Sequence, residues 1–209
     1  MMCSSSSRTG RARTITRPGK NRLQWLLLLC AAGFLIQGNF IHLKAILAQH
    51  LIESAWSESL TSGDFSPPWS WADWQPVARL EFPEHQQEFF VLSDISGAAL
   101  AFGPGLHPGG ASPEEQGTTI IGGHRDTHFS VLEKIKKGEL IRLQNRRGEW
   151  KSYRVSSLEV ADTETTGLRR VPSAGSHLIL ITCYPFHSIN PGGSLRYIVK
   201  ADAIQVAAH

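Results

Sequence analysis

The chain has 209 residues, of which 21 are basic and 18 are acidic, so its formal net charge is +3. This length allows one domain with appendages, and a hydrophobic content of 41% with 19 glycines and 11 prolines fits a turn-rich globular protein. Six basic residues fall in the first 22 positions, which hold no acid, and the remainder carries a net charge of −3. The charge of that remainder therefore gives no reason to expect that it binds nucleic acid.

An apolar segment follows this basic leader, residues 1–22. Its uninterrupted stretch from Trp25 to Ile36 is 12 residues long, short of the roughly 20 that cross a bilayer. Extending the segment to residues 23–43 reaches that length and includes four polar side chains. We expect residues 23–43 to form a transmembrane anchor, with the leader in the cytoplasm and the rest exported.

Two other interpretations of the N-terminus compete with a retained anchor. A cleaved signal peptide has the same basic and apolar regions, but no A-x-A cleavage site follows Ile36. A lipoprotein needs a small residue before its cysteine, whereas Leu29 precedes Cys30. A retained anchor requires neither feature, and we favour it.

Residues 44–76 are predicted to form a membrane-proximal helix and a linker. Apolar residues recur at helical spacing between Phe40 and Leu60, so this helix continues the anchor and ends at Gly63. The segment that follows is rich in proline and tryptophan, which indicates a linker. We expect its three tryptophans to pack on the domain; positions at the lipid headgroups or in a substrate groove are the alternatives.

From Val77 onward, short apolar or alternating segments recur between turn signals. Seven of them predict strands: residues 77–82, 88–93, 118–123, 140–145, 150–160, 178–183 and 196–206. We expect a short helix within residues 95–105, a loop at 102–117 and one helical turn at 131–137. Seven or eight strands with little helix predict a mainly β fold, a small closed barrel over residues 77–209.

Cys183 ends one of these predicted strands, because Pro185 lacks the N–H that would continue it. Cys3 lies in the leader and Cys30 in the predicted anchor, so Cys183 is the one cysteine of the exported part. Such a thiol has no intramolecular disulfide partner and is either buried and inert or kept for reactivity.

Two further side chains complete a chemical set. His124 follows Gly122 and Gly123 at the end of an apolar run, and Arg196 lies on the strand after Cys183. A thiol, an imidazole and a guanidinium supply the nucleophile, proton carrier and oxyanion stabiliser for attack on a carbonyl. Asp126 and Thr182 are supporting candidates, Asp126 pairing with a neighbouring arginine or orienting His124, and Thr182 lying near the oxyanion.

Two other histidines offer alternative roles. His124 and His128 have H-x-x-x-H spacing, which with Cys183 would give a zinc site. Two histidines at that spacing bind a common metal ion when they lie on a helix, and the flanking Gly-Gly and Asp-Thr disfavour a helix here. We therefore expect no metal and no cofactor. His187 lies four residues after the cysteine, beyond Pro185, which favours a loop position over a role as the base.

Three motifs, TCYPF at 182–186, LRYIV at 195–199 and GGHRDTHF at 122–129, resemble those of the sortases, which are membrane-anchored cysteine transpeptidases. The resemblance covers about residues 77–206, and GGHRDT with the short N-terminal anchor is most similar to the Gram-negative sortases. It implies a sortase-type barrel in which Cys183, His124 and Arg196 are catalytic. It also implies a single-pass protein of the bacterial inner membrane whose catalytic domain faces the periplasm.

The resemblance further implies the partners. The substrate is an exported protein with a C-terminal LPxTG-like sorting signal, cleaved between Thr and Gly through a thioacyl-enzyme and transferred to an amine. Residues between Ala161 and Ser176 are assigned to the pocket for that signal. Two alternatives remain: a cysteine peptidase acting at the same site, and a non-enzymatic, membrane-anchored β-barrel that binds peptides.

Overall fold

The computed structural model describes residues 18–164, 175–188 and 192–204. The basic leader before residue 18 therefore lies outside the described residues, as does most of the predicted pocket segment, residues 165–174. The chain forms two compact units, residues 1–44 and 45–209. The helix α1 (Pro18–Ser62) contributes to both.

The helix predicted at residues 40–60 is the second half of α1. Ala48, Ile52 and Ala55 are buried, as their helical spacing requires. The helix ends at Ser62, directly before Gly63, whose φ of 76° is a left-handed conformation that favours glycine, and whose N–H donates to the Ser59 carbonyl at 3.1 Å. No helix in the described part of the chain combines the length and apolarity needed to cross a membrane, so the span expected at residues 23–43 is not shown.

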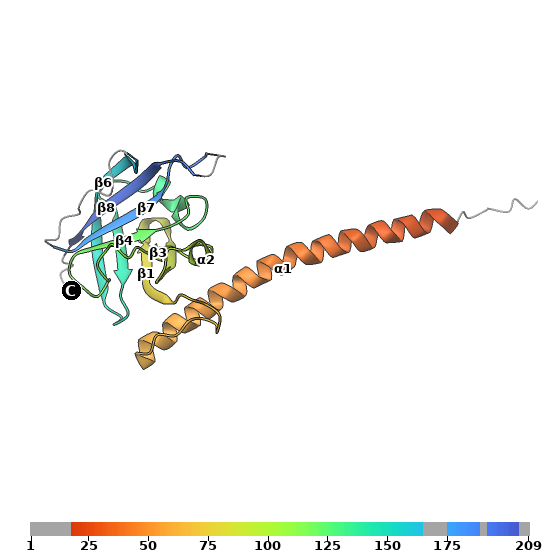
Figure 1. Ribbon diagram of the computed structural model, residues 1–209, viewed down its shortest axis with the longest axis horizontal. Helices are drawn as coiled ribbons and strands as arrows, with labels where there is room; N and C mark the ends of the chain where they lie inside the picture. Colours follow the sequence, from red (N-terminus) through yellow and green to blue (C-terminus); the bar gives the residue numbers. More distant parts are fainter. Residues whose placement is uncertain (1–17, 165–174, 189–191, 205–209) are drawn as a thin grey trace, which may run out of the picture. The chain divides into compact units, whose positions relative to one another are not determined.

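The described residues of the second unit form eight strands that close into a barrel in the order β1-β2-β3-β4-β7-β8-β6-β5. Their bounds are β1 Pro76–Phe82, β2 Gln87–Leu92, β3 Gly105–Leu106, β4 Thr118–Gly122, β5 Leu140–Gln144, β6 Trp150–Asp162, β7 His177–Cys183 and β8 Leu195–Ile204. Figure 1 shows β4, β7 and β8 side by side in one wall. The predicted closed β-barrel is confirmed. The predicted loop at 102–117 contains β3, which at two residues is too short to recognise from a pattern.

Short helices connect the strands: η1 (Pro83–His85), α2 (Gly97–Leu100) and η2 (His128–Glu133). Helix α2 lies within the predicted range 95–105. The turn predicted at 131–137 begins three residues earlier, as η2. It begins there because the Phe129 N–H donates to the His124 carbonyl at 3.0 Å and the Phe129 ring is fully buried in the core.

Apolar side chains from all the long strands fill the barrel. The largest fully buried ones include Phe82, Leu80, Ile121, Leu143, Tyr153, Leu178 and Leu180. A second cluster joins the linker to the barrel, where Trp69 and Trp74 contact each other and Phe102 with centroid distances of 5.2–5.3 Å. The expected packing of the linker tryptophans holds for these two, whereas Trp71 is 79% exposed.

Candidate active site

His124 and Cys183 follow the ends of two neighbouring parallel strands. Strands β4 and β7 pair in parallel with Gly122 opposite Ile181, so both end at the same edge of the barrel. The Gly123 N–H donates to the Ile181 carbonyl at 3.1 Å, which extends the pairing one residue beyond β4. This register brings His124 to the level of Cys183.

Gly123 is required by its surroundings. A Cβ atom there would lie 2.8 Å from the ring of Phe129, closer than real Cβ contacts come. The absence of a side chain lets the chain pass over this ring and turn, and the His124 carbonyl then accepts the Phe129 N–H. The glycine before the histidine thus fixes the backbone from which the imidazole projects.

Cys183 and Arg196 face each other across two antiparallel strands. They are directly opposite in the register of β7 and β8, which places their side chains on the same face of the sheet. The Tyr184 N–H donates to the Leu195 carbonyl at 3.1 Å, so the next pair along, Cys183–Arg196, is a non-hydrogen-bonded one. In such pairs the Cα atoms are only about 4.5 Å apart.

All three side chains line one cavity of about 400 Å³. Its walls are mostly apolar and include Ile95, Leu100, Ile120, Ile181 and Ile198. The thiol is half-buried and the histidine is exposed, so a ligand in the cavity reaches both. The structure therefore brings together the three residues that the motifs single out.

The Arg196 guanidinium is oriented by its own turn. Its Nη1 donates to the carbonyls of Gly193 at 2.5 Å and Leu195 at 2.9 Å. Its Nε and Nη2 donate to no group within the described ranges. These N–H groups remain for a developing negative charge or a peptide carbonyl.

The two supporting candidates occupy different positions. The Thr182 hydroxyl is buried and donates to the Gly123 carbonyl at 2.8 Å, which joins the strand of the cysteine to the segment of the histidine. Asp126 is 68% exposed and accepts from the Arg125 Nε at 3.3 Å, an ion pair with the neighbouring arginine.

The two alternative histidines do not line the cavity of Cys183. His128 is half-buried and packs edge-on against Phe89, and burial together with repulsion from His124 lowers its pKa below the usual value. His187 is highly exposed and lies 2.9 Å from the carboxylate of Glu133. The described residues contain no group of three or more His, Cys, Asp or Glu arranged to hold a metal ion.

Sequence reasoning missed two residues at this site. His107 lines the cavity, and its Nδ1 accepts the Gly109 N–H at 3.0 Å. Arg125 is buried beneath the loop after the cysteine. The only signal for Arg125 was its place in the GGHRDT motif, and His107 had none. Of the segment predicted to form the pocket, Ala161, Asp162 and Thr163 line the cavity.

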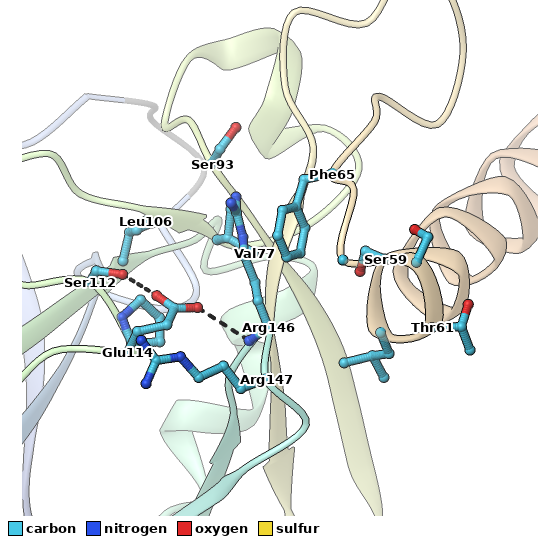
Figure 2. Close-up of a pocket in the computed structure, with 14 residues that line it drawn as sticks. Ser59, Thr61, Phe65, Val77, Ser93, Leu106, Ser112, Glu114, Arg146 and Arg147 are labelled. Carbon is cyan, nitrogen blue, oxygen red and sulfur yellow. Dashed lines mark hydrogen bonds between the residues drawn. The ribbon is translucent and has the colours of Figure 1, made fainter.

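A larger cavity, of about 830 Å³, lies between the end of α1 and the β5–β6 turn (Figure 2). It shares no lining residue with the cavity of Cys183, and its lining contains neither cysteine nor histidine. Figure 2 shows Glu114 between Ser112 and Arg146, with Phe65 alongside Arg146. Glu114 thus accepts two hydrogen bonds from other residues of the lining.

Comparison with known proteins agrees with this geometry. The family model of the sortase domain matches residues 80–204. The chain is 30% identical to "Sortase D" of Bacillus subtilis (strain 168) over 120 residues, 57% of this chain and 60% of that protein. It therefore spans less than two thirds of that relative's length.

Solved structures show the same fold. Sortase A from Corynebacterium diphtheriae is 26% identical with a TM-score of 0.57, and the match covers 65% of this chain and 64% of that one. The Sortase D5 transpeptidase of Clostridium perfringens is 17% identical with a TM-score of 0.61, over 76% of this chain and 99% of that one, and shows the fold alone. The assignment to the Gram-negative group stays a prediction. The match of the family model over more than half of the sequence shows that the chain belongs to the sortase family.

Proposed function

We propose that this protein is a membrane-anchored cysteine transpeptidase that cleaves a sorting signal and transfers the acyl part to an amine. One observation carries the proposal: Cys183 lies directly opposite Arg196, and both line a single cavity with His124. A nucleophile, an oxyanion donor and a proton carrier at one opening form the set that acyl transfer requires.

In the first half-reaction, the Cys183 sulfur attacks a substrate carbonyl. A C–S bond forms, and the carbonyl π electrons move to the oxygen, whose negative charge is stabilised by the N–H groups of Arg196. The intermediate collapses, the C–N bond breaks and His124 gives a proton to the leaving amine. The products are a thioacyl-enzyme and a free amine.

In the second half-reaction, an incoming amine attacks the thioester carbonyl and forms a new C–N bond. His124 accepts the proton of the attacking nitrogen, and the C–S bond breaks to regenerate the sulfur nucleophile. Water in place of the amine would make the reaction a hydrolysis. The apolar walls around Cys183 favour an acceptor that is held in place over bulk water.

The proposed substrate is an exported protein with an LPxTG-like signal, cleaved between Thr and Gly. Support comes from family membership and from the cavity, whose isoleucines suit the apolar side chains of such a signal. The volume of about 400 Å³ lies in the range of sites for small ligands and holds a few residues rather than a folded domain.

We further propose that residues 23–43 anchor the protein in the bacterial inner membrane with the catalytic unit in the periplasm. Support comes from residues 23–43 of α1, where large apolar side chains are more than half exposed: Leu23, Trp25, Leu26, Leu27, Leu28, Leu29, Phe34, Leu35, Phe40 and Leu43. Such a contiguous apolar surface indicates contact with lipid or protein. Protease treatment of intact vesicles tests the topology, and a C-terminal tag that proves cytoplasmic would refute it.

The experiment for the activity uses the full chain, an LPxTG-containing peptide and an added amine such as hydroxylamine. Wild-type protein should gain the mass of the acyl fragment and release the transfer product, which is a hydroxamate when hydroxylamine is the acceptor, whereas Cys183→Ala should show neither. Cys30→Ala is the matched control, because this thiol lies on the exposed first half of α1 and should not affect turnover. Undiminished turnover by Cys183→Ala would refute the proposal, and hydrolysis despite excess amine would make the protein a peptidase.

A further inference from the structure

Arg125, the residue after His124, is a charged side chain that is only 8% exposed. Its Nη1 donates to the Pro185 carbonyl at 2.8 Å and its Nη2 to the Ser188 carbonyl at 2.7 Å. Charged residues are almost never buried unless they are paired. Here two short charge-assisted hydrogen bonds to one loop, together with the contact of Nε with Asp126 at 3.3 Å, pair the guanidinium.

Both carbonyls belong to the loop that begins immediately after Cys183. Arg125 itself lies on the segment after β4, which the Thr182 hydroxyl and the Gly123 N–H join to β7. The guanidinium therefore forms a bridge between the segment that carries the histidine and the loop that follows the cysteine. Its planar fork fixes two acceptors at once, which a lysine ammonium on a flexible stem does not do.

The same loop is held on its other side by aromatic packing. The ring of Phe186 lies 5.1 Å from that of Tyr197 on β8, and Tyr184 stacks with Tyr197 at 6.1 Å. The Tyr184 N–H also donates to Leu195, whose carbonyl accepts from Arg196. A shift of the loop would therefore move the cysteine and the guanidinium opposite it together.

We propose that Arg125 is a positioning residue that fixes the loop 184–188 against the histidine segment and so sets the geometry between the thiol and the imidazole. This inference rests on the proposed function. It assigns Arg125 no contact with the substrate. A purely structural role would lower the stability of the fold and leave the turnover of each folded molecule unchanged.

The test compares Arg125→Lys and Arg125→Gln with wild type in the full chain, with Cys3 and Cys30 replaced by alanine. Arg154→Lys is the matched control, because that arginine also donates to a carbonyl, Gly138, at 2.9 Å, but is exposed and outside the cavity. The kcat per folded, thiol-titrated enzyme should fall about 10- to 100-fold in both Arg125 variants, as expected for a small misplacement of reacting groups. KM should change by less than about threefold, since Arg125 does not line the cavity.

A second measurement needs no peptide turnover: the rate constant for alkylation of Cys183 by iodoacetamide in the native protein. It should change in both Arg125 variants and stay constant in Arg154→Lys. Wild-type kcat and alkylation rate in folded Arg125→Lys or Arg125→Gln would overturn the inference. If wild type fails to turn over the peptide, the proposed function fails, and the alkylation rates still decide whether Arg125 positions the thiol. If the Lys variant does not fold, the Gln variant decides.

Discussion

Two cavities of the barrel unit differ in a way that size does not reveal. The cavity in Figure 2 has about 830 Å³ and the cavity of Cys183 about 400 Å³. In the larger one Glu114 is already paired: it accepts from Ser112 and from the Arg146 N–H, and the Arg146 guanidinium lies 4.1 Å from the centroid of Phe65. In the smaller one, Arg196 retains donors and the thiol is accessible. Available chemical groups identify the site better than volume does.

The paired groups of the larger cavity join segments that are distant in sequence. Glu114 belongs to the loop before β4, Arg146 to the β5–β6 turn and Phe65 to the linker after α1. Nearby, the Lys151 ammonium donates to the carbonyls of Pro113 and Glu115 at 2.8 and 3.0 Å. We infer that this region stabilises the fold, so changes here should affect unfolding, and changes around Cys183 should affect turnover.

The largest effect on turnover, apart from loss of the thiol, is expected for Arg196→Lys. Lysine keeps the charge but lacks the planar set of donors, and loss of an oxyanion donor costs about 3–4 kcal/mol in the transition state. The kcat should therefore fall about 10²- to 10³-fold while the melting temperature stays nearly constant, because the hydrogen bonds of Arg196 are local to its turn. Steady-state kinetics and calorimetry measure the two quantities. Near-normal kcat would show that this arginine is structural.

The smaller cavity also contains a polar group that is already hydrogen-bonded, the hydroxyl of Thr182. The change Thr182→Val tests how much this hydrogen bond contributes to stability. Valine keeps the shape but removes the buried hydroxyl, which leaves the Gly123 carbonyl without this donor. The free energy of unfolding in urea should fall by about 1–3 kcal/mol. Thr163→Val is the control, because its hydroxyl bonds to the Ser194 carbonyl at an exposed position and should matter less. Equal losses in the two variants would contradict the role assigned to burial.

Arg146→Ala should distinguish the roles of the two cavities most clearly, because it should lower stability and leave turnover unchanged. The change removes a guanidinium stacked on Phe65, worth about 0.5–1 kcal/mol, and leaves every residue around Cys183 in place. Stability should fall by about that amount, and kcat and KM should remain those of wild type. A loss of turnover at unchanged stability would mean that the larger cavity takes part in the reaction, and the contrast between the two regions would fail.

The sequence predicted the site better than the details around it, for physical reasons. Cys183, His124 and Arg196 were recognisable because strand ends are marked by Gly-Gly and by proline, and because the motifs match a family. The partners of Arg125 were not predictable, since they are carbonyls of Pro185 and Ser188, some 60 residues away, whose positions depend on the shape of a loop. Every residue has a backbone carbonyl, so the identity of a residue does not indicate which carbonyl will accept a hydrogen bond.

The larger cavity was unpredictable for the same reason, because it forms where several segments without a common pattern meet. Strand β3 escaped detection because its pairing involves only Gly105 and Leu106. The barrel was predictable because period-two patterning is local. Contacts between loops are set by tertiary packing, which single-residue patterns do not encode.

The smallest effect is expected at Glu114 in the larger cavity, where the contribution of the carboxyl to stability should depend on pH. Burial disfavours its charged form, but the hydrogen bonds from Ser112 and the backbone, together with the charge of Arg146, outweigh burial and lower the pKa of this carboxyl below its usual value. A lowered folded-state pKa stabilises the fold at pH values above the pKa of the unfolded chain, and this contribution is lost as the pH falls through the folded-state value. Glu114→Gln should thus be less stable than wild type near neutral pH by a few tenths of a kcal/mol.

The difference between Glu114→Gln and wild type should shrink in acid, because the wild-type carboxyl is then protonated and resembles the amide. Urea unfolding at several pH values from neutral into acid measures it, with the exposed neighbour in Glu115→Gln as the control. A difference that grows as the pH falls would show that Glu114 is destabilising when charged. In that case the groups of the larger cavity would not be mutually satisfied, and the region would have to be reconsidered as a binding site.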